Sequence, residues 1–175
     1  AKTDQSAGAK GISLVLLDTK NAEGFSRGKP LKKLGLKGND TAELFFDNVK
    51  IPLTNLIGNE EGQGFYQMMN QLPWERLLIG ITALGAIDFA LQETIKYVQD
   101  RKAFGKRIMD LQNTRFKLAE AKTKAEVFRS FVNECIARLI KGKLDAATAS
   151  MAKYWGSQIQ NEIMDECLQL HGGYG

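Results

Sequence analysis

The chain has 175 residues, of which 43% are hydrophobic and 25% are charged. This is enough apolar side chain to bury a core in one domain or two small ones, which excludes a disordered tail. The 24 basic and 20 acidic residues give a net charge of +4, and so even a mixture argues against a dedicated nucleic-acid-binding protein.

Cysteine and histidine usage argues against a metal site. Cys135 and Cys167 stand far apart, no CxxC pair is present, and His171 is the only histidine. This pattern favours a reducing compartment, such as a bacterial cytoplasm or a mitochondrial matrix. It disfavours a structural zinc ion or a catalytic Cys/His pair.

No membrane span is predicted, because the longest apolar run, residues 77–87, is far shorter than the roughly 20 residues that cross a bilayer. The chain starts without an initiator Met and stops in HGGYG. We therefore expect it to be a fragment of a longer protein.

Residues 11–47 carry the signals of strands and turns. GISLVLLD is a short apolar run, NAEGFSRGKP is a turn-rich connector, and TAELFFDNVKIP is rich in β-branched and aromatic residues up to Pro52. Two to four strands are predicted. Residues 1–58 are interpreted as part of a β domain, and so few strands with open edges are not expected to be stable alone.

Residues 59–175 carry the helical spacing of apolar side chains. Helices are predicted over 63–101, 110–140 and 145–171, with Asp110 capping the second and Gly105 just past the end of the first. Short links make consecutive helices antiparallel. The predicted fold class is mainly α with a β portion, in which three long antiparallel helices of a four-helix bundle follow a partial β domain.

The first candidate site is QLPWERLLIG, where Glu75 and Arg76 interrupt an apolar run. On a helix Glu75 shares its face with Leu72 and Ile79, and burial among such residues makes a carboxylate a stronger base. Arg76 shares its face with Gly80, which would let another element or a ligand approach closely. The alternative is a structural ion pair near a helix end.

The second candidate site is RKAFGKRIMDLQ, in which four cations surround Phe104 and Gly105 and Gln112 opens the next helix. Arg101 and exposed backbone N–H groups could grip an anionic group, while Phe104 offers its face or edge to a ring. The alternative is a helix C-terminus whose cations suit the helix dipole.

The third candidate site is QLHGGYG at the end of the chain. The paired glycines Gly172 and Gly173 would let backbone come close to a ligand, and Gln169 offers an amide for hydrogen bonding. The alternative is a glycine cap at the end of the last helix.

Taken in order, these motifs resemble the acyl-CoA dehydrogenase family, flavoenzymes that desaturate acyl-CoA thioesters. The resemblance rests on DTAELFFDNVKIP, GQGF, ERLLIG, RKAFGK with its following LQ, and QLHGGYG, and it covers almost the whole chain. It implies that residues 1–58 are the C-terminal part of the middle β domain and that 59–175 are the first three helices of the C-terminal bundle. It also implies FAD as cofactor, an acyl-CoA substrate, a homotetramer, and an electron-transfer flavoprotein as the partner that takes the electrons.

The resemblance also implies roles for individual residues. The residues implied to bind the cofactor are Arg101, Phe104, Gln112, Gln169, Gly172 and Gly173. The first three would reach across a subunit interface to the FAD of a neighbouring protomer, and the last three would approach its adenosine end. His171 occupies a variable position of the motif and is given no role.

Family members carry the catalytic base in one of two places. LPWERL resembles the long-chain branch, which places the base on the first bundle helix, and this assigns Glu75 as the base. Arg76 is interpreted as a substrate-binding or orienting residue, with a structural role as the alternative. The other place is a Tyr-Glu-Gly-Thr-like loop, which would lie beyond Gly175.

The implied reaction is α,β-dehydrogenation of an acyl-CoA thioester to trans-2-enoyl-CoA. Two alternatives stay open: an acyl-CoA oxidase, whose reduced flavin meets oxygen directly, and a non-catalytic helical assembly module. The 175 residues alone are predicted to be inactive, since half of the implied cofactor site would lie outside them.

Overall fold

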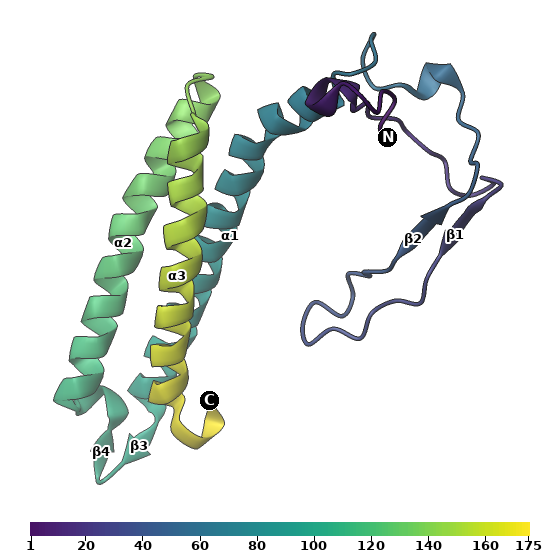
Figure 1. Cartoon of the computed structure of the whole chain (residues 1–175). Coiled ribbons are helices and arrows are strands. Elements are labelled where there is room, and N and C mark those ends of the chain that lie inside the picture. Colours follow the sequence, from purple (N-terminus) through teal and green to yellow (C-terminus); the bar gives the residue numbers. More distant parts are fainter. The chain divides into compact units, whose positions relative to one another are not determined.

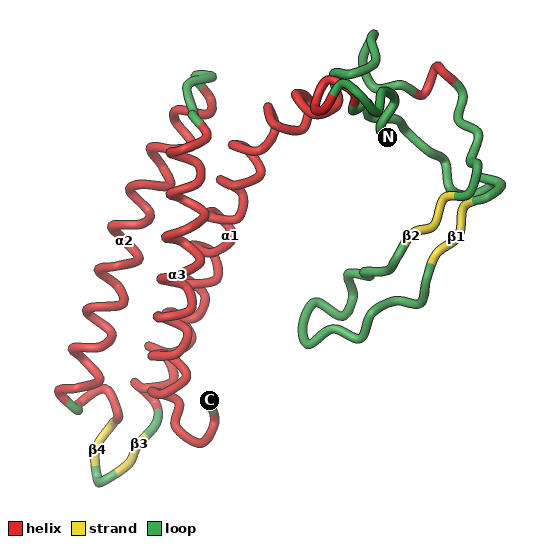
Figure 2. Tube along the Cα trace, in the orientation of Figure 1, coloured by secondary structure: helices red, strands yellow, loops and turns green.

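The computed structural model describes all 175 residues, Ala1–Gly175, and the chain divides into two units, Ala1–Met68 and Met69–Gly175. In Figure 1 the second unit consists of long helices joined by short links, and Figure 2 shows that loops make up most of the first. The assignment of residues 1–58 and 59–175 to two domains of a longer protein stays a prediction.

The first unit contains one two-stranded antiparallel sheet. Strand β1 (Phe25–Arg27) pairs with β2 (Leu44–Phe46), with Phe25 opposite Phe46. The rings of these two phenylalanines lie 5.3 Å apart between centroids, a cross-strand contact that stabilises such a pair. Strand β1 lies inside the stretch that the sequence predicts to be a connector.

The predicted strand in GISLVLLD is wrong. Its residues form only single bridges, Lys2 with Ile12 and Val15 with Leu56. The reason lies in the partner segment, because Leu53–Asn55 is a turn of 3-10 helix (η2) and cannot extend a ladder. A second short 3-10 helix, η1 (Gly8–Gly11), precedes the run.

The first unit buries almost no apolar surface of its own. Its buried residues are small ones: Gly11, Ser13, Gly62 and Gly64. All three residues of β2 are more than half exposed. This agrees with the expectation that such a β portion is not stable alone, since burial of apolar surface is the main driving force for folding.

The second unit is built from α1 (Gly64–Asp100), which begins in the first unit, α2 (Gln112–Ile140) and α3 (Ala146–His171). Between α1 and α2 come the hairpin β3 (Lys102–Ala103) and β4 (Lys106–Arg107) and the 3-10 turn η3 (Ile108–Asp110), and η4 (Gly172–Tyr174) ends the chain. The three predicted helices and the mainly helical fold class are confirmed.

Side-chain contacts fix the direction of each helix. Lys117 and Lys124 of α2 pair with Glu166 and Glu162 of α3, in the reverse order. Arg76 and Thr94 of α1 contact Ser150 and His171 of α3, in the same order. Consecutive helices therefore run antiparallel, as predicted. Helices α1 and α3 run parallel and also touch each other, so the three helices enclose a shared core (Figure 1).

The core follows the predicted spacing on α1, where Leu84, Ile87, Leu91 and Val98 are buried. Phe128 of α2 is fully buried and meets Trp155 of α3 edge-on, with 5.5 Å between ring centroids. On α3 Ile159 and Ile163 are buried, whereas Met151 is 55% exposed. Small residues take its place in the core: Ala149, Ala152 and Gly156.

Two predicted helix boundaries differ in their chemistry. Asp110 does not cap α2, because Leu111 is the cap residue of that helix. The Asp110 carboxylate instead closes the η3 turn, accepting hydrogen bonds from the Arg107 backbone N–H at 3.2 Å and from the Arg107 side chain. Gly105 does not end α1, because it lies in the turn of the β3–β4 hairpin. Asp145 does cap α3, accepting from the Thr148 N–H at 2.8 Å.

One helix, α1, is long and apolar enough by composition to cross a membrane. The core helix of a soluble bundle can have the same length and apolar composition. Helix α1 contributes buried residues to the core that it shares with α2 and α3. Its composition is therefore weak evidence for a membrane span.

Candidate functional site

Glu75 lies on α1 in an apolar but open setting. Its side chain is exposed, and nearby Trp74, Leu78 and Ile79 are each about 40% exposed. The predicted burial of Glu75 is therefore wrong for this chain, although its neighbours are apolar as predicted. The cause is orientation, because α1 turns Leu77 and the rest of its buried residues toward α2 and α3 and leaves the Glu75 side uncovered.

Arg76, the next residue, points the other way. It is half-buried and donates from Nη1 to the hydroxyl of Ser150 on α3 at 2.9 Å. Neither Glu75 nor Arg76 forms an ion pair, so the alternative of a structural ion pair at this point does not hold. The carboxylate of Glu75 is left free to act on a ligand.

The small residue predicted to permit close approach does so. A Cβ on Gly80 would lie 3.1 Å from the carbonyl oxygen of Ala152, and Gly80 is buried. The element that approaches is therefore α3. This contact brings α1 and α3 together one turn from Arg76 and holds the helix surface that presents Glu75.

A pocket of about 480 Å³ lies at the other end of α1 and collects most of the predicted cofactor-binding residues. Among its lining residues are Arg101, Gln169, Gly172 and Gly173. They come from two segments far apart in the sequence, the end of α1 and the end of α3. Phe104 and Gln112 are not part of its lining.

Phe104 projects from the tip of the β3–β4 hairpin. It is 91% exposed, and Phe104 and Gly105 have positive φ angles of 54° and 76°. This is the pattern of a two-residue type I′ turn, for which Asn-Gly is the favoured sequence. The left-handed conformation costs free energy for a residue with a bulky side chain such as phenylalanine. Backbone strain of this kind is found at functional sites. Gln112 is exposed at the first turn of α2.

The glycine pair forms the turn that ends α3. Gly172 has φ 61° and its N–H donates to the Gln169 carbonyl, so the glycine cap, the structural alternative for this motif, is present. A Cβ on Gly172 or Gly173 would meet no atom within 4 Å, which leaves the backbone of the turn open on one side. Both properties suit a backbone that caps a helix and also faces a ligand.

Arg101 lines the pocket as an unpaired cation. It forms no ion pair, and its Cζ atom lies 5.5 Å from the ring centroid of Tyr174. A guanidinium without a carboxylate partner keeps its donors free for an anionic group such as a phosphate.

His171, for which the sequence predicts no role, makes specific contacts with α1. Its ring stacks on Tyr97 with 4.2 Å between centroids and 10° between planes, and its Nε2 lies 3.3 Å from the Thr94 hydroxyl. No signal in the sequence could have found this contact, because 77 positions separate Thr94 from His171.

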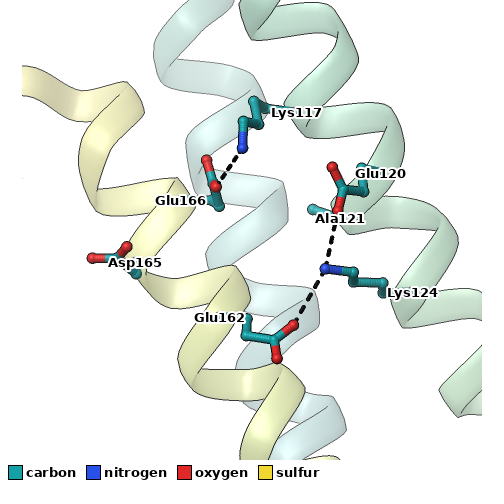
Figure 3. Close-up of a pocket in the computed structure, with 7 residues that line it drawn as sticks. All are labelled: Lys117, Glu120, Ala121, Lys124, Glu162, Asp165 and Glu166. Atoms are coloured by element: carbon teal, nitrogen blue, oxygen red, sulfur yellow. Dashed lines mark hydrogen bonds and ion pairs between the residues drawn. The ribbon is translucent and has the colours of Figure 1, made fainter.

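A second pocket, of about 200 Å³, lies between α2 and α3 and is lined by charged side chains (Figure 3). Lys117 pairs with Glu166 at 2.6 Å, and Lys124 bridges Glu120 and Glu162 at 3.0 and 3.2 Å. The hydrogen bond to Glu166 raises the pKa of Lys117, and those to Glu120 and Glu162 raise the pKa of Lys124. Both cations of this pocket have acidic partners, and the pairs that reach Glu162 and Glu166 link α2 to α3.

Comparison with known proteins decides the family. Residues 62–175 match the C-terminal domain of acyl-CoA dehydrogenases, which is more than half of the chain. The chain belongs to the acyl-CoA dehydrogenase family. The resemblance drawn from its motifs is thereby confirmed.

Similar proteins include acyl-CoA dehydrogenases and reductases. The long-chain specific acyl-CoA dehydrogenase of Rattus norvegicus mitochondria is 50% identical over 95% of this chain and 38% of its own length. The caffeyl-CoA reductase-Etf complex subunit CarC of Acetobacterium woodii is 41% identical over the whole chain and 46% of its own length. The crystal structure of an acyl-CoA dehydrogenase from Geobacillus kaustophilus superposes with a TM-score of 0.93 at 43% identity, covering 99% of this chain and 46% of that one.

This acyl-CoA dehydrogenase family chain spans less than half the length of these relatives. The residues predicted from the sequence gather at two separate places, the Glu75 surface and the Arg101 pocket. The two places lie at opposite ends of α1.

Proposed function

We propose that the protein that contains this chain catalyses the FAD-dependent α,β-dehydrogenation of acyl-CoA thioesters to trans-2-enoyl-CoA. The observation that carries the proposal is a free carboxylate, Glu75, in the middle of an apolar helix surface of an acyl-CoA dehydrogenase family member. The relative with 50% identity is named for the same activity on long-chain substrates.

Glu75 would act as the base that removes the proton from the α-carbon of the thioester. An acyl chain bound against Trp74, Leu78 and Ile79 would cover apolar surface and exclude water from the carboxylate, which makes a carboxylate a stronger base. Arg76 would serve as an orienting residue, because its bond to Ser150 fixes the helix surface next to Glu75.

The pocket at the other end of α1 would receive the adenosine diphosphate part of FAD. Arg101 would face the phosphates, Gln169 and the open backbone of Gly172 and Gly173 would approach the adenosine end, and the exposed Phe104 and Gln112 would add contacts to the same cofactor. When FAD is bound, it supplies the redox chemistry by accepting the hydride from the β-carbon. The chain itself supplies position and charge.

The spacing of the two places supports assembly from several copies. Glu75 and Arg101 lie about 39 Å apart along α1 at 1.5 Å of rise per residue, so one chain does not bring both against the same reacting group. A neighbouring protomer would supply Arg101, Phe104 and Gln112 to the flavin that Glu75 serves, in a homotetramer. The electron acceptor would be an electron-transfer flavoprotein, in keeping with the Etf complex in the name of the Acetobacterium woodii relative.

The two cysteines are free and buried, which suits a reducing compartment such as a bacterial cytoplasm or a mitochondrial matrix. The name of the Acetobacterium woodii relative favours a second candidate function, the reverse reaction, in which a 2-enoyl-CoA is reduced.

The test is a product assay on the natural protein. The purified protein should show flavin absorbance and convert acyl-CoA to trans-2-enoyl-CoA when an electron-transfer flavoprotein is added. Turnover that runs only from enoyl-CoA to acyl-CoA with a reduced donor would replace the proposal with the reductase. Reoxidation by oxygen alone would indicate an oxidase, and absence of flavin would indicate a non-catalytic assembly module.

A further inference from the structure

Three polar and stacking contacts hold His171, the last residue of α3. Its ring stacks on Tyr97 and its Nε2 lies 3.3 Å from the hydroxyl of Thr94, which is 2% exposed. The hydroxyl of Tyr97 also donates to the His171 backbone carbonyl at 3.2 Å. Two residues one turn apart on α1 thus fix both the ring and the backbone of one residue on α3.

His171 is followed directly by the glycine pair, whose conformation depends on its neighbours. Glycine has the largest backbone freedom of any residue, and Gly172 and Gly173 have no atoms within 4 Å on the side where a Cβ would lie. The Gly172 N–H donates to the Gln169 carbonyl and the Gly175 N–H donates to the Gly172 carbonyl. Side-chain contacts also hold the two ends of the turn. His171 anchors one end on Tyr97 and Thr94, and Tyr174 at the other end lies over the guanidinium of Arg101.

These contacts link the turn to the pocket. Tyr97, Arg101, His171, Gly172 and Gly173 all line the same 480 Å³ space. A movement of His171 away from Tyr97 would therefore shift the glycine backbone relative to Arg101. The distance across the pocket between the glycine backbone and the Arg101 guanidinium would then change.

We propose that His171 is a positioning residue, which with Thr94 and Tyr97 sets the Gly172–Gly173 turn in the conformation that receives the adenosine diphosphate part of the cofactor. The proposal rests on the proposed function, since the ligand is FAD. His171 acts through the turn and does not take part in the chemistry of the acyl group. Its effect is on the affinity for the cofactor, because a turn that is already ordered loses less conformational entropy when a ligand binds.

Separate variants of the natural protein remove the contacts one at a time. His171→Phe keeps the stacking on Tyr97 and loses the Thr94 contact, His171→Gln keeps a polar atom near Thr94 and loses the stacking, and His171→Ala loses both. Thr94→Val removes the hydroxyl that contacts the His171 ring. Asp165→Asn is the matched control, because Asp165 is exposed on α3 two turns earlier and does not line this pocket.

The primary readout is the dissociation constant of FAD measured by titration of the apoprotein, together with the melting temperature of the apoprotein. We expect His171→Ala to weaken FAD binding by about tenfold or more, the equivalent of ordering roughly one residue. His171→Phe and Thr94→Val should show equal and smaller losses that do not add in the double variant. At saturating FAD, kcat and the KM for acyl-CoA should stay at the level of the unmodified protein.

The proposal is overturned if the variants bind FAD as tightly as the unmodified protein while their apoproteins melt at lower temperature, because His171 would then only stabilise the fold. If His171→Ala does not fold, the Phe and Gln variants decide by the same measurement. If the unmodified protein binds no FAD, the proposed function itself is contradicted. If the unmodified protein binds FAD and the variants bind it equally tightly, only the His171 proposal fails.

Discussion

The guanidinium of Arg76 on α1 donates a hydrogen bond to the hydroxyl of Ser150 on α3 across 2.9 Å. Ser150 in turn donates to the Ala146 carbonyl one turn earlier. Arg76 therefore faces the bundle, while its neighbour Glu75 faces away from it. The adjacent Glu75 and Arg76 side chains therefore lie on different faces of α1, and the bond from Arg76 to Ser150 joins α1 to α3 beside Glu75.

Removing the Ser150 hydroxyl should weaken this link. We expect Ser150→Ala to lower the free energy of unfolding of the natural protein by about 1 kcal/mol, the typical net value of one intramolecular hydrogen bond. Urea denaturation followed by circular dichroism measures the change. Ser157→Ala is the matched control, because its hydroxyl bonds only to the Tyr154 carbonyl of the same helix. Equal stability of the two variants would show that the Arg76–Ser150 bond contributes nothing.

Two glycines of the bundle should respond in opposite ways to alanine. A Cβ on Gly156 would lie 2.5 Å from Cζ of the fully buried Phe128, so Gly156→Ala should cost about 1–3 kcal/mol through overpacking. A Cβ on Gly85 meets nothing within 4 Å, so Gly85→Ala should raise stability by about 0.4–1 kcal/mol. Thermal denaturation of both variants tests the pair. A stabilising Gly156→Ala would mean that α1, α2 and α3 pack less closely than described.

The hairpin tip offers a test of function against stability. Phe104→Asn creates the favoured turn sequence and should raise the unfolding free energy above that of Phe104→Ala by about 1 kcal/mol, since Asn tolerates the left-handed region better than other residues. Both variants lose the ring and should weaken FAD binding equally, by up to about tenfold for one aromatic contact. If FAD binding is unchanged in both, Phe104 has no contact with the cofactor.

The cap of α3 predicts a dependence of stability on pH. Hydrogen bonds from the Thr148 side chain and backbone lower the pKa of Asp145. A carboxyl whose pKa is lower in the folded state contributes stability above its ordinary value and loses that contribution as the pH falls through the folded value. The stability difference between the unmodified protein and Asp145→Ala should therefore shrink in strong acid. Asp145→Asn, which keeps an acceptor but does not titrate, should show no such acid-dependent loss, and an equal difference at neutral and acid pH for Asp145→Ala would contradict the cap.

The helices could be predicted from the sequence because their spacing is local. The buried residues Leu84, Ile87 and Val98 follow a helical period that is visible without a structure. The same period states which residues share a face with Glu75, but it does not state which face meets α2 and α3. The expectation of a buried Glu75 failed at that step.

Features that depend on distant contacts or unusual turn residues could not be predicted. The hairpin around Phe104 and Gly105 was missed because a phenylalanine is not a residue that signals a left-handed turn. The contact of His171 with Thr94 and Tyr97 depends on how two helices are aligned, which composition and period do not determine. Gln169 and the paired glycines of the last motif line the pocket, but the motif does not show which contacts hold the pocket in shape.

The assignment of Glu75 as the base is tested most directly by Glu75→Gln in the natural protein, with Glu75→Asp as a companion. Glutamine keeps the size of the side chain and cannot accept the proton. With flavin content unchanged, we expect acyl-CoA turnover to fall by about 10²–10⁴-fold, the usual contribution of a general base, and exchange of the α-proton of the bound thioester with solvent to stop. Glu75→Asp should keep part of the turnover and part of the α-proton exchange. Turnover and proton exchange of Glu75→Gln close to those of the unmodified protein would contradict the account and place the base on another residue.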